Sequence, residues 1–236
     1  NDGVGDLLLG APYLPLAGGD PGDAGAAYIV YGTANPFERP FSVDLASIAG
    51  APSLGTVVLG SVPNFGGVTS AGDLAGWSVA SLGDVNGDGI DDVVIGAPNA
   101  DAPFTGAGAA YVVFGTADPS GLAFASLATL TPDQGFKIEG QIGHVFAQTG
   151  FSVAAAGDVN GDGLRDILVG APGALDDLGD PVGAAYVIYG SDSQPGIGLD
   201  DIAADVGGFR VLGTNALGTF GASVDGIGDV NGDGID

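Results

Sequence analysis

The chain has 236 residues, of which 29 are acidic and 4 are basic, so its formal net charge is −25, and it contains no cysteine. The charge excludes nucleic acid and anionic membrane surfaces as partners, and the lack of cysteine excludes a disulfide framework. No apolar run reaches the roughly 18 residues of a membrane-inserted helix. With 45% hydrophobic residues the chain can bury a sizeable core, and its 46 glycines indicate short strands and tight turns rather than helices.

The chain opens within a sequence unit that recurs further on. Its first segment, NDGVGDLLLGAP (Asn1 to Pro12), places acidic residues directly before an apolar run. The segments GAAYIVYG (Gly25 to Gly32) and TVVLGSV (Thr56 to Val62) follow, and turns rich in Gly, Pro and Asp separate them. These runs predict short strands in a first unit of roughly residues 1–75.

The second unit, roughly residues 76–149, shows the whole pattern. GWSVASLGD (Gly76 to Asp84) leads into the acidic loop of GDVNGDGIDDVVIGAP (Gly83 to Pro98). GAAYVVFG (Gly108 to Gly115) and FKIEGQI (Phe136 to Ile142) come next. Because DVVIGAP and AAYVVFG are almost continuously apolar, we expect strands that are covered on both faces.

The same order recurs in a third unit, roughly residues 150–220, and begins again in a fourth, roughly residues 221–236. The third unit contains GFSVAAAGD (Gly150 to Asp158), GDVNGDGLRDILVGAP (Gly157 to Pro172), GAAYVIYG (Gly183 to Gly190) and FRVLGTN (Phe209 to Asn215). The fourth contains GASVDGIGD (Gly221 to Asp229) and GDVNGDGID (Gly228 to Asp236). Four short strands in a repeat of this length predict an all-β fold of β-propeller-type four-stranded blades, with about three blades in this chain.

Three blades are fewer than the roughly four to eight that close a propeller ring. We therefore expect either a piece of a longer array or self-association through exposed blade faces. Tyr28, Tyr111 and Tyr186 hold the same place in the three GAAY segments, and we expect them to pack between blades. A β-solenoid is the alternative fold, although its repeats are usually much shorter.

Each complete acidic loop places oxygen-bearing side chains at its first, third, fifth and ninth positions, with Gly at the sixth. In the second unit these side chains are Asp84, Asn86, Asp88 and Asp92, and Ile90 at the seventh position offers its backbone carbonyl. This spacing is that of the first half of an EF-hand calcium loop. Hard oxygen donors favour Ca²⁺ over soft metals, and Ca²⁺ tolerates irregular geometry better than Mg²⁺. The sequence therefore predicts Ca²⁺ as the cofactor, in a structural role, with a metal-free acidic turn as the alternative.

Two of these loops are complete and two are not. The complete predicted sites are Asp84, Asn86, Asp88, Ile90 and Asp92, and Asp158, Asn160, Asp162, Leu164 and Asp166. The last loop offers Asp229, Asn231, Asp233 and Ile235, and the first offers Asp2, Val4 and Asp6. We expect weak or absent Ca²⁺ binding at the two incomplete loops. Arg165, at the eighth position of its loop, is expected to offset local negative charge.

The combined pattern resembles the FG-GAP repeat of integrin α-subunit β-propellers and their bacterial extracellular relatives. The resemblance rests on the Ser-Val before each loop, on Gly-Asp-Val-Asn-Gly-Asp-Gly in the loop and on Gly-Ala-Pro after it. At the motif position ahead of Ser-Val, the literal Phe-Gly pair stands only at Phe220-Gly221, whereas Trp77 and Phe151 follow the corresponding glycines of the second and third units. The resemblance implies a calcium-binding, extracellular or cell-surface module for adhesion or for recognition of a protein or glycan ligand.

Two other functions stay open from the sequence. One is a self-assembling structural subunit of a filament or surface layer, and the other is an accessory domain of a secreted polysaccharide-degrading enzyme. The chain itself is not expected to be an enzyme. His144 has no motif partner, and the pairs Asp176-Asp177 and Asp200-Asp201 fall in turn-rich segments, where they are expected to be solvated.

Overall fold

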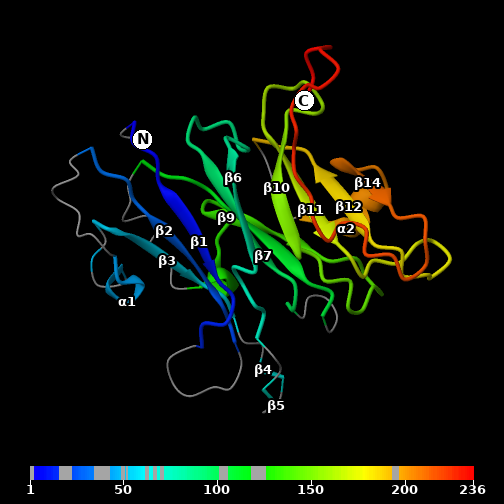
Figure 1. Cartoon of the computed structure of the whole chain (residues 1–236), viewed down its shortest axis with the longest axis horizontal. Helices are drawn as coiled ribbons and strands as arrows, with labels where there is room; N and C mark the ends of the chain where they lie inside the picture. The colour runs from blue at the N-terminus through cyan, green and yellow to red at the C-terminus, as the bar shows by residue number, and fades with distance from the viewer. Residues whose placement is uncertain are drawn as a thin grey trace.

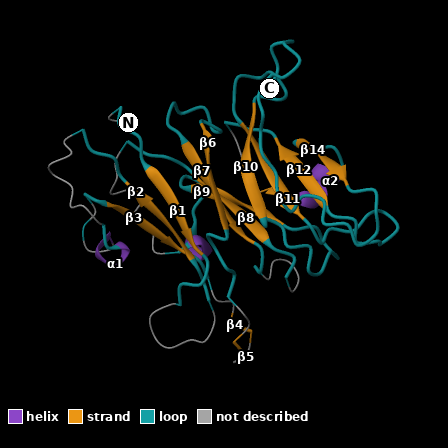
Figure 2. Ribbon diagram, in the orientation of Figure 1, coloured by secondary structure: helices purple, strands orange, loops and turns teal. Residues whose placement is uncertain are grey.

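The computed structural model of this chain is all-β, and its sheets are antiparallel apart from one short parallel pairing (Figures 1 and 2). It describes residues 3–15, 23–34, 43–48, 51, 53–61, 64–65, 68–69, 72–100, 106–117, 126–192 and 197–236. Asp2, a predicted ligand of the first loop, lies outside these residues. Within the described part of the chain, no helix has the length and hydrophobicity needed to cross a membrane.

Three sheets follow one another along the chain, as propeller blades do (Figure 1). The first contains β1 (Leu7–Ala11), β2 (Ala26–Val30) and β3 (Gly55–Leu59), in that order. The second contains β6 (Ser78–Gly83), β7 (Asp92–Ala97), β8 (Ala109–Val113) and β9 (Gly135–Glu139), with the short β13 (Ile197–Gly198) beside β9. The third contains β10 (Ser152–Gly157), β11 (Asp166–Ala171), β12 (Ala184–Ile188) and β14 (Gly208–Leu212). The prediction of about three blade-like sheets is confirmed.

The remaining elements are short and lie between or beside these sheets. They are the hairpin β4 (Asn64–Phe65) and β5 (Val68–Thr69), the helices α1 (Leu45–Ile48) and α2 (Leu199–Ala203), and a 3₁₀-helix at Leu127–Thr129. The sequence pattern indicated none of these helices.

The central strands of each sheet are covered on both faces, as their apolar sequences predict. Every residue of β8 is buried. Because successive side chains of a strand point to opposite faces, Tyr111 and Val113 pack toward the first sheet whereas Val112 packs toward the third. The GAAY tyrosines accordingly lie in the hydrophobic clusters between and beside the sheets.

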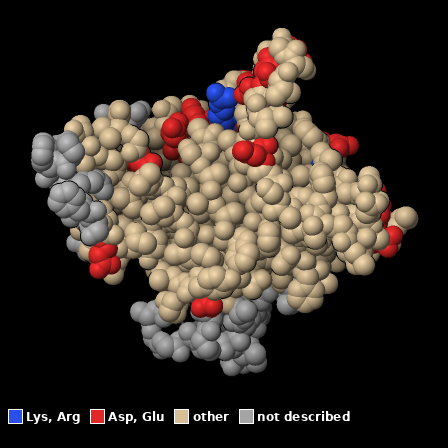
Figure 3. Space-filling view, in the orientation of Figure 1, with Lys and Arg blue, Asp and Glu red and all other residues tan. Residues whose placement is uncertain are grey.

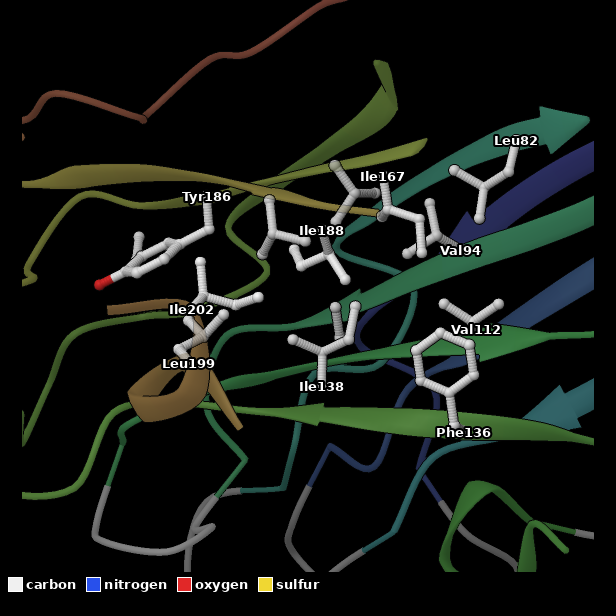
Figure 4. Packing of buried hydrophobic residues seen from close by; sticks show 14 of the residues in the cluster. Leu82, Val94, Val112, Phe136, Ile138, Ile167, Tyr186, Ile188, Leu199 and Ile202 are labelled. Carbon is white, nitrogen blue, oxygen red and sulfur yellow. The ribbon is translucent and has the colours of Figure 1, made fainter. Parts of the chain in front are cut away.

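The largest hydrophobic cluster joins the second and third sheets (Figure 4). Val112 and Ile138 of the second sheet face Ile167 and Ile188 of the third, and Leu199 of α2 closes one side. Full burial of each such aliphatic side chain contributes about 1.5–3 kcal/mol. The blades are therefore fixed to each other by a continuous apolar core.

The glycine of Gly-Ala-Pro is explained by a close backbone approach between neighbouring blades. A Cβ atom on Gly96 would overlap the carbonyl oxygen of Gly150, which also accepts a hydrogen bond from Ser78 Oγ at 2.8 Å. The next pair of blades repeats this geometry: Gly170 abuts the Gly221 carbonyl, and Ser152 Oγ donates to that oxygen at 2.7 Å. The Ser of Ser-Val and the Gly of Gly-Ala-Pro thus form one inter-blade contact.

The prediction of a strand at Gly221 to Asp229 is wrong, because these residues form no regular secondary structure. The equivalent segments β6 and β10 each pair with the strand that follows their acidic loop, β7 and β11. The described residues from Asp229 onward form no such partner strand. Ile227 is consequently 76% exposed, whereas the equivalent Leu82 is 2% exposed.

The first strands of the three sheets, β1, β6 and β10, are neighbours in space. β6 lies beside both β1 and β10. The acidic loops that follow β6 and β10 therefore lie next to each other at one end of the array (Figure 1).

Candidate functional site

The first aspartate of the complete loop between β6 and β7 organises the turn. Asp84 Oδ1 accepts hydrogen bonds from the backbone N–H groups of Gly87 at 2.6 Å and Asp88 at 3.2 Å. Asp84 Oδ2 accepts one from Gly89 N at 2.8 Å. Gly89, at the sixth position, has φ of +84°, a left-handed conformation that only Gly adopts without strain. One carboxylate thus satisfies three amides of its own loop.

Asn86 and Asp88, at the third and fifth positions of this loop, are hydrogen-bonded to each other. Asp88 N donates to Asn86 Oδ1 at 2.9 Å, and Asn86 Nδ2 donates to Asp88 Oδ2 at 3.2 Å. Asp88 Oδ1 accepts from Ile90 N at 2.8 Å. The predicted ligand side chains are therefore gathered on one loop by bonds of short sequence separation.

The ninth-position aspartate lies beneath the loop and is buried. Asp92 is 0% exposed; its Oδ2 accepts from Val85 N at 2.9 Å and its Oδ1 from Gly115 N at 2.8 Å. Burial raises the pKa of Asp92 to about 6, although these two amide hydrogen bonds act in the opposite direction. Its carboxylate ties the loop to the segment that follows β8.

The loop between β10 and β11 has the same construction. Asp158 accepts from Gly161 N at 2.8 Å and from Gly163 N at 2.9 Å. Asp166 is 0% exposed and accepts from Val159 N at 2.8 Å and from Gly190 N at 2.9 Å. Burial raises the pKa of Asp166 as well. Asn160 and Asp162 bond to each other, and Asp162 accepts from Leu164 N.

The incomplete loops keep part of the network. Asp229 accepts from Gly232 N at 2.6 Å and from Gly234 N at 2.8 Å. Asn231, Asp233 and Ile235 repeat the bonds of the complete loops. At the front, Asp6 accepts from Gly32 N at 2.7 Å, which matches the bond from Gly115 to Asp92. Val4 is also among the described residues of this loop.

The loops offer the right atoms for a hard cation, but not a closed cage. Across the described residues, no three His, Cys, Asp or Glu side chains converge as a metal-binding cluster. The carboxylate and amide oxygens instead accept loop N–H groups. The first-position Oδ1 accepts two of these amides, whereas the other oxygens accept one each and keep a second lone pair. Oxygen donors of this kind are the ligands that Ca²⁺ takes. The donor chemistry therefore fits Ca²⁺.

The opposite end of the array carries a row of aromatic side chains that the sequence reasoning missed as a site. The rings of Tyr13 and Trp77 lie 6.2 Å apart, edge to face, and those of Trp77 and Phe151 lie 5.4 Å apart. Tyr13 is 62% exposed and Trp77 37% exposed. Because Trp77 directly precedes β6 and Asp84 directly follows it, about 20 Å of strand separates this aromatic row from the acidic loops. The available signal was the aromatic residue after Gly in GWSVA and GFSVA.

Other large apolar side chains are exposed on loops of the second and third units. Phe146 and Leu217 each stand four residues before the glycine that opens a unit, and they are 66% and 85% exposed. Both have left-handed backbones, with φ of 60° and 63°, a conformation that costs a non-glycine residue about 1–2 kcal/mol. Such strain is characteristic of functional surfaces. Ile142, Val145 and Leu178 are also exposed on loops of the second and third units.

The residues considered for catalysis have structural partners. His144 Nδ1 accepts from Leu175 N at 3.2 Å, and burial lowers the pKa of His144. Asp177 pairs with Arg210 at 2.6 Å, and Asp200 accepts from Ile142 N at 3.0 Å. These bonds hold loops in place at the end of the array that carries the aromatic row, which we call the apolar end.

Comparison with known proteins identifies the repeat. The FG-GAP repeat matches residues 75–113 and 149–188. Integrin alpha pat-2 of Caenorhabditis elegans is 33% identical over 180 residues, which cover 71% of this chain and 13% of the relative. Integrin alpha-2 of Bos taurus is 33% identical over 203 residues, covering 80% and 16%, and integrin alpha-3 of Cricetulus griseus is 32% identical over 196 residues, covering 78% and 16%. The chain thus spans about one seventh of the length of these relatives.

Proposed function

This chain is an FG-GAP repeat protein similar to integrin alpha subunits, and from that premise we propose that it is an extracellular or cell-surface recognition module whose apolar end binds a protein ligand. The observation that carries the proposal is the aromatic row, in which Tyr13 and Trp77 are exposed and Phe151 is half-buried. The role is binding or adhesion rather than catalysis.

The kind of side chain at the aromatic end supports a role in protein binding. Aromatic side chains are enriched in protein interfaces, and a few of them carry most of the binding energy. The rings of the aromatic row touch one another, Tyr13 and Trp77 stay open to solvent, and further apolar side chains are exposed on loops of the second and third units. A surface of this kind fits a protein partner, with glycan recognition as the alternative.

Calcium is proposed to act at the other end, as a structural ion. Asp84, Asn86, Asp88 and Asp92, and Asp158, Asn160, Asp162 and Asp166, would hold it, with the carbonyls of Ile90 and Leu164. A bound cation would offset the repulsion among carboxylates of one loop and connect the two strands that flank it. The incomplete loops, with Asp229, Asn231 and Asp233 or with Asp2 and Asp6, would bind more weakly.

The recognition proposal is tested with a microarray of purified extracellular proteins, probed with the labelled chain in Ca²⁺ and in EGTA. Trp77→Ala should abolish binding to any protein that the unmodified chain captures. Phe209→Ala is the matched control, because Phe209 is 38% exposed, close to the 37% of Trp77, but lies on β14, away from the aromatic row.

Retained binding by the Trp77→Ala variant, or no captured protein across the array, contradicts the proposal. A glycan array probed in parallel addresses the polysaccharide-related alternative. Mass measurement in solution addresses the structural-subunit alternative, because a discrete monomer excludes a filament.

A further inference from the structure

We propose that Arg165 is a fixed counter-ion that links three neighbouring acidic loops and sets their affinity for divalent cations. The part that concerns affinity rests on the proposed calcium role of the loops. The part that concerns linkage stands on the contacts of Arg165 alone.

Arg165 reaches the preceding loop through its backbone and the stem of its side chain. Arg165 N donates to the carbonyl oxygen of Asp84, the first residue of that loop, at 3.1 Å. The side-chain stem lies over Gly83, where a Cβ atom would be 3.0 Å from Arg165 Cγ. The two complete loops are therefore in direct contact through this residue.

Arg165 reaches the following loop through its guanidinium group. Arg165 Nη1 lies 2.9 Å from Asp236 Oδ2, and the same oxygen accepts a hydrogen bond from Asp158 N at 3.1 Å. Asp236 holds the eighth position of its loop, as Arg165 does in its own, and it abuts Gly157 as Arg165 abuts Gly83. The eighth residue of each of these loops thus docks on the glycine that precedes the loop before it.

The charge at this position is unusual among the loops. Arg165 occupies a position that is Gly5, Asp91 and Asp236 in the others. Of the other basic residues that the structure describes, Lys137 pairs with Glu139 and Arg210 with Asp177, away from the loops. Figure 3 shows a basic group among acidic side chains at the upper edge of the molecule.

A positive charge fixed among these loops has two opposite effects. Without a cation, it offsets repulsion among the carboxylates and joins adjacent loops. With a cation, it repels the ion: a unit charge about 10 Å from a dication in water weakens binding about fourfold at low salt. Both effects decline as salt screens the charges.

The test uses isothermal titration with Ca²⁺ and thermal melting in EGTA, at about 20 mM and about 500 mM salt. At low salt, Arg165→Gln should bind Ca²⁺ about three- to fourfold more tightly and melt about 1–3 °C lower in EGTA. Arg165→Lys should keep the Ca²⁺ affinity of the unmodified chain because it keeps the charge. At high salt the difference between Arg165→Gln and the unmodified chain should largely disappear.

Asp91→Asn is the matched control, because it removes a charge of opposite sign from the equivalent position. This variant should bind Ca²⁺ more weakly. Equal affinity and equal melting temperature of Arg165→Gln and the unmodified chain at low salt would overturn the proposal. If the unmodified chain binds no Ca²⁺, the calcium role fails, and the melting comparison in EGTA still decides whether Arg165 links the loops.

Discussion

The two ends of the blade array differ in what their side chains do for the fold. At the acidic end, Asp84 and Asp92 accept backbone amides of their own hairpins, so their geometry has an internal purpose. At the apolar end, Trp77 is partly exposed and Phe146 is held in a left-handed conformation, and folding alone explains neither. The difference agrees with the proposal that the first end maintains structure and the second recognises a partner.

The largest effect is expected from the buried ninth-position carboxylate. Asp92→Ala leaves the amides of Val85 and Gly115 without their acceptor, and should lower the free energy of unfolding by about 3–4 kcal/mol. Asp6→Ala, at the exposed equivalent with one such bond, should cost about 1 kcal/mol. Urea unfolding measures both. Equal losses would show that burial of this aspartate does not matter.

The next largest effect is expected at the backbone contact between blades, which lies at the end that carries the aromatic row. Gly96→Ala forces a methyl group against the Gly150 carbonyl and should cost about 2–3 kcal/mol. Because Phe151 follows Gly150, the change should also alter Trp77 fluorescence. Gly5→Ala, where the added atom meets nothing within 4 Å, is the control and should leave both readouts unchanged. A tolerated Gly96→Ala would contradict the close packing of the blades.

Much of the acidic end could be predicted from the sequence, because its bonds connect residues that are close in the chain. The positions of Asp84, Asn86 and Asp88 follow from their spacing, and so does the turn at Gly89. The aromatic row could not be predicted in this way, since Tyr13, Trp77 and Phe151 belong to three units and meet only when blades pack. The absence of a strand at Gly221 to Asp229 has a different cause, because the described residues from Asp229 onward supply no partner strand.

His144, at the apolar end, should make the stability of the chain depend on pH. The change in the free energy of unfolding should be smaller than for the substitutions above. Burial lowers its pKa below the ordinary 6.5, and Arg210 acts in the same direction against Asp200 and Asp177. The unfolded chain therefore takes up the proton first, and stability should fall as the pH falls below about 6.5. Melting at several pH values, compared with His144→Gln, isolates this contribution, and NMR of the single histidine reports its titration. Identical pH dependence in both proteins would exclude it.

The smallest effect is expected from relief of the left-handed backbone. Phe146→Asn removes an exposed ring from a residue at φ of 60° and should stabilise the chain by about 0.5–1 kcal/mol. Thermal melting measures the change, and Val145→Asn, at an exposed neighbour without positive φ, is the control. A clear loss of stability in Phe146→Asn would mean that the ring serves the fold and not recognition.

The division between the ends is tested most directly by melting the unmodified chain in Ca²⁺, Mg²⁺ and EGTA. Each complete loop should add about 1.4 kcal/mol when Ca²⁺ is at ten times its dissociation constant, so the melting temperature should rise by about 6–10 °C in Ca²⁺. Mg²⁺ should have a smaller effect, and Trp77→Ala should show the same rise as the unmodified chain. An equal melting temperature in Ca²⁺ and EGTA would contradict the structural role of the acidic end.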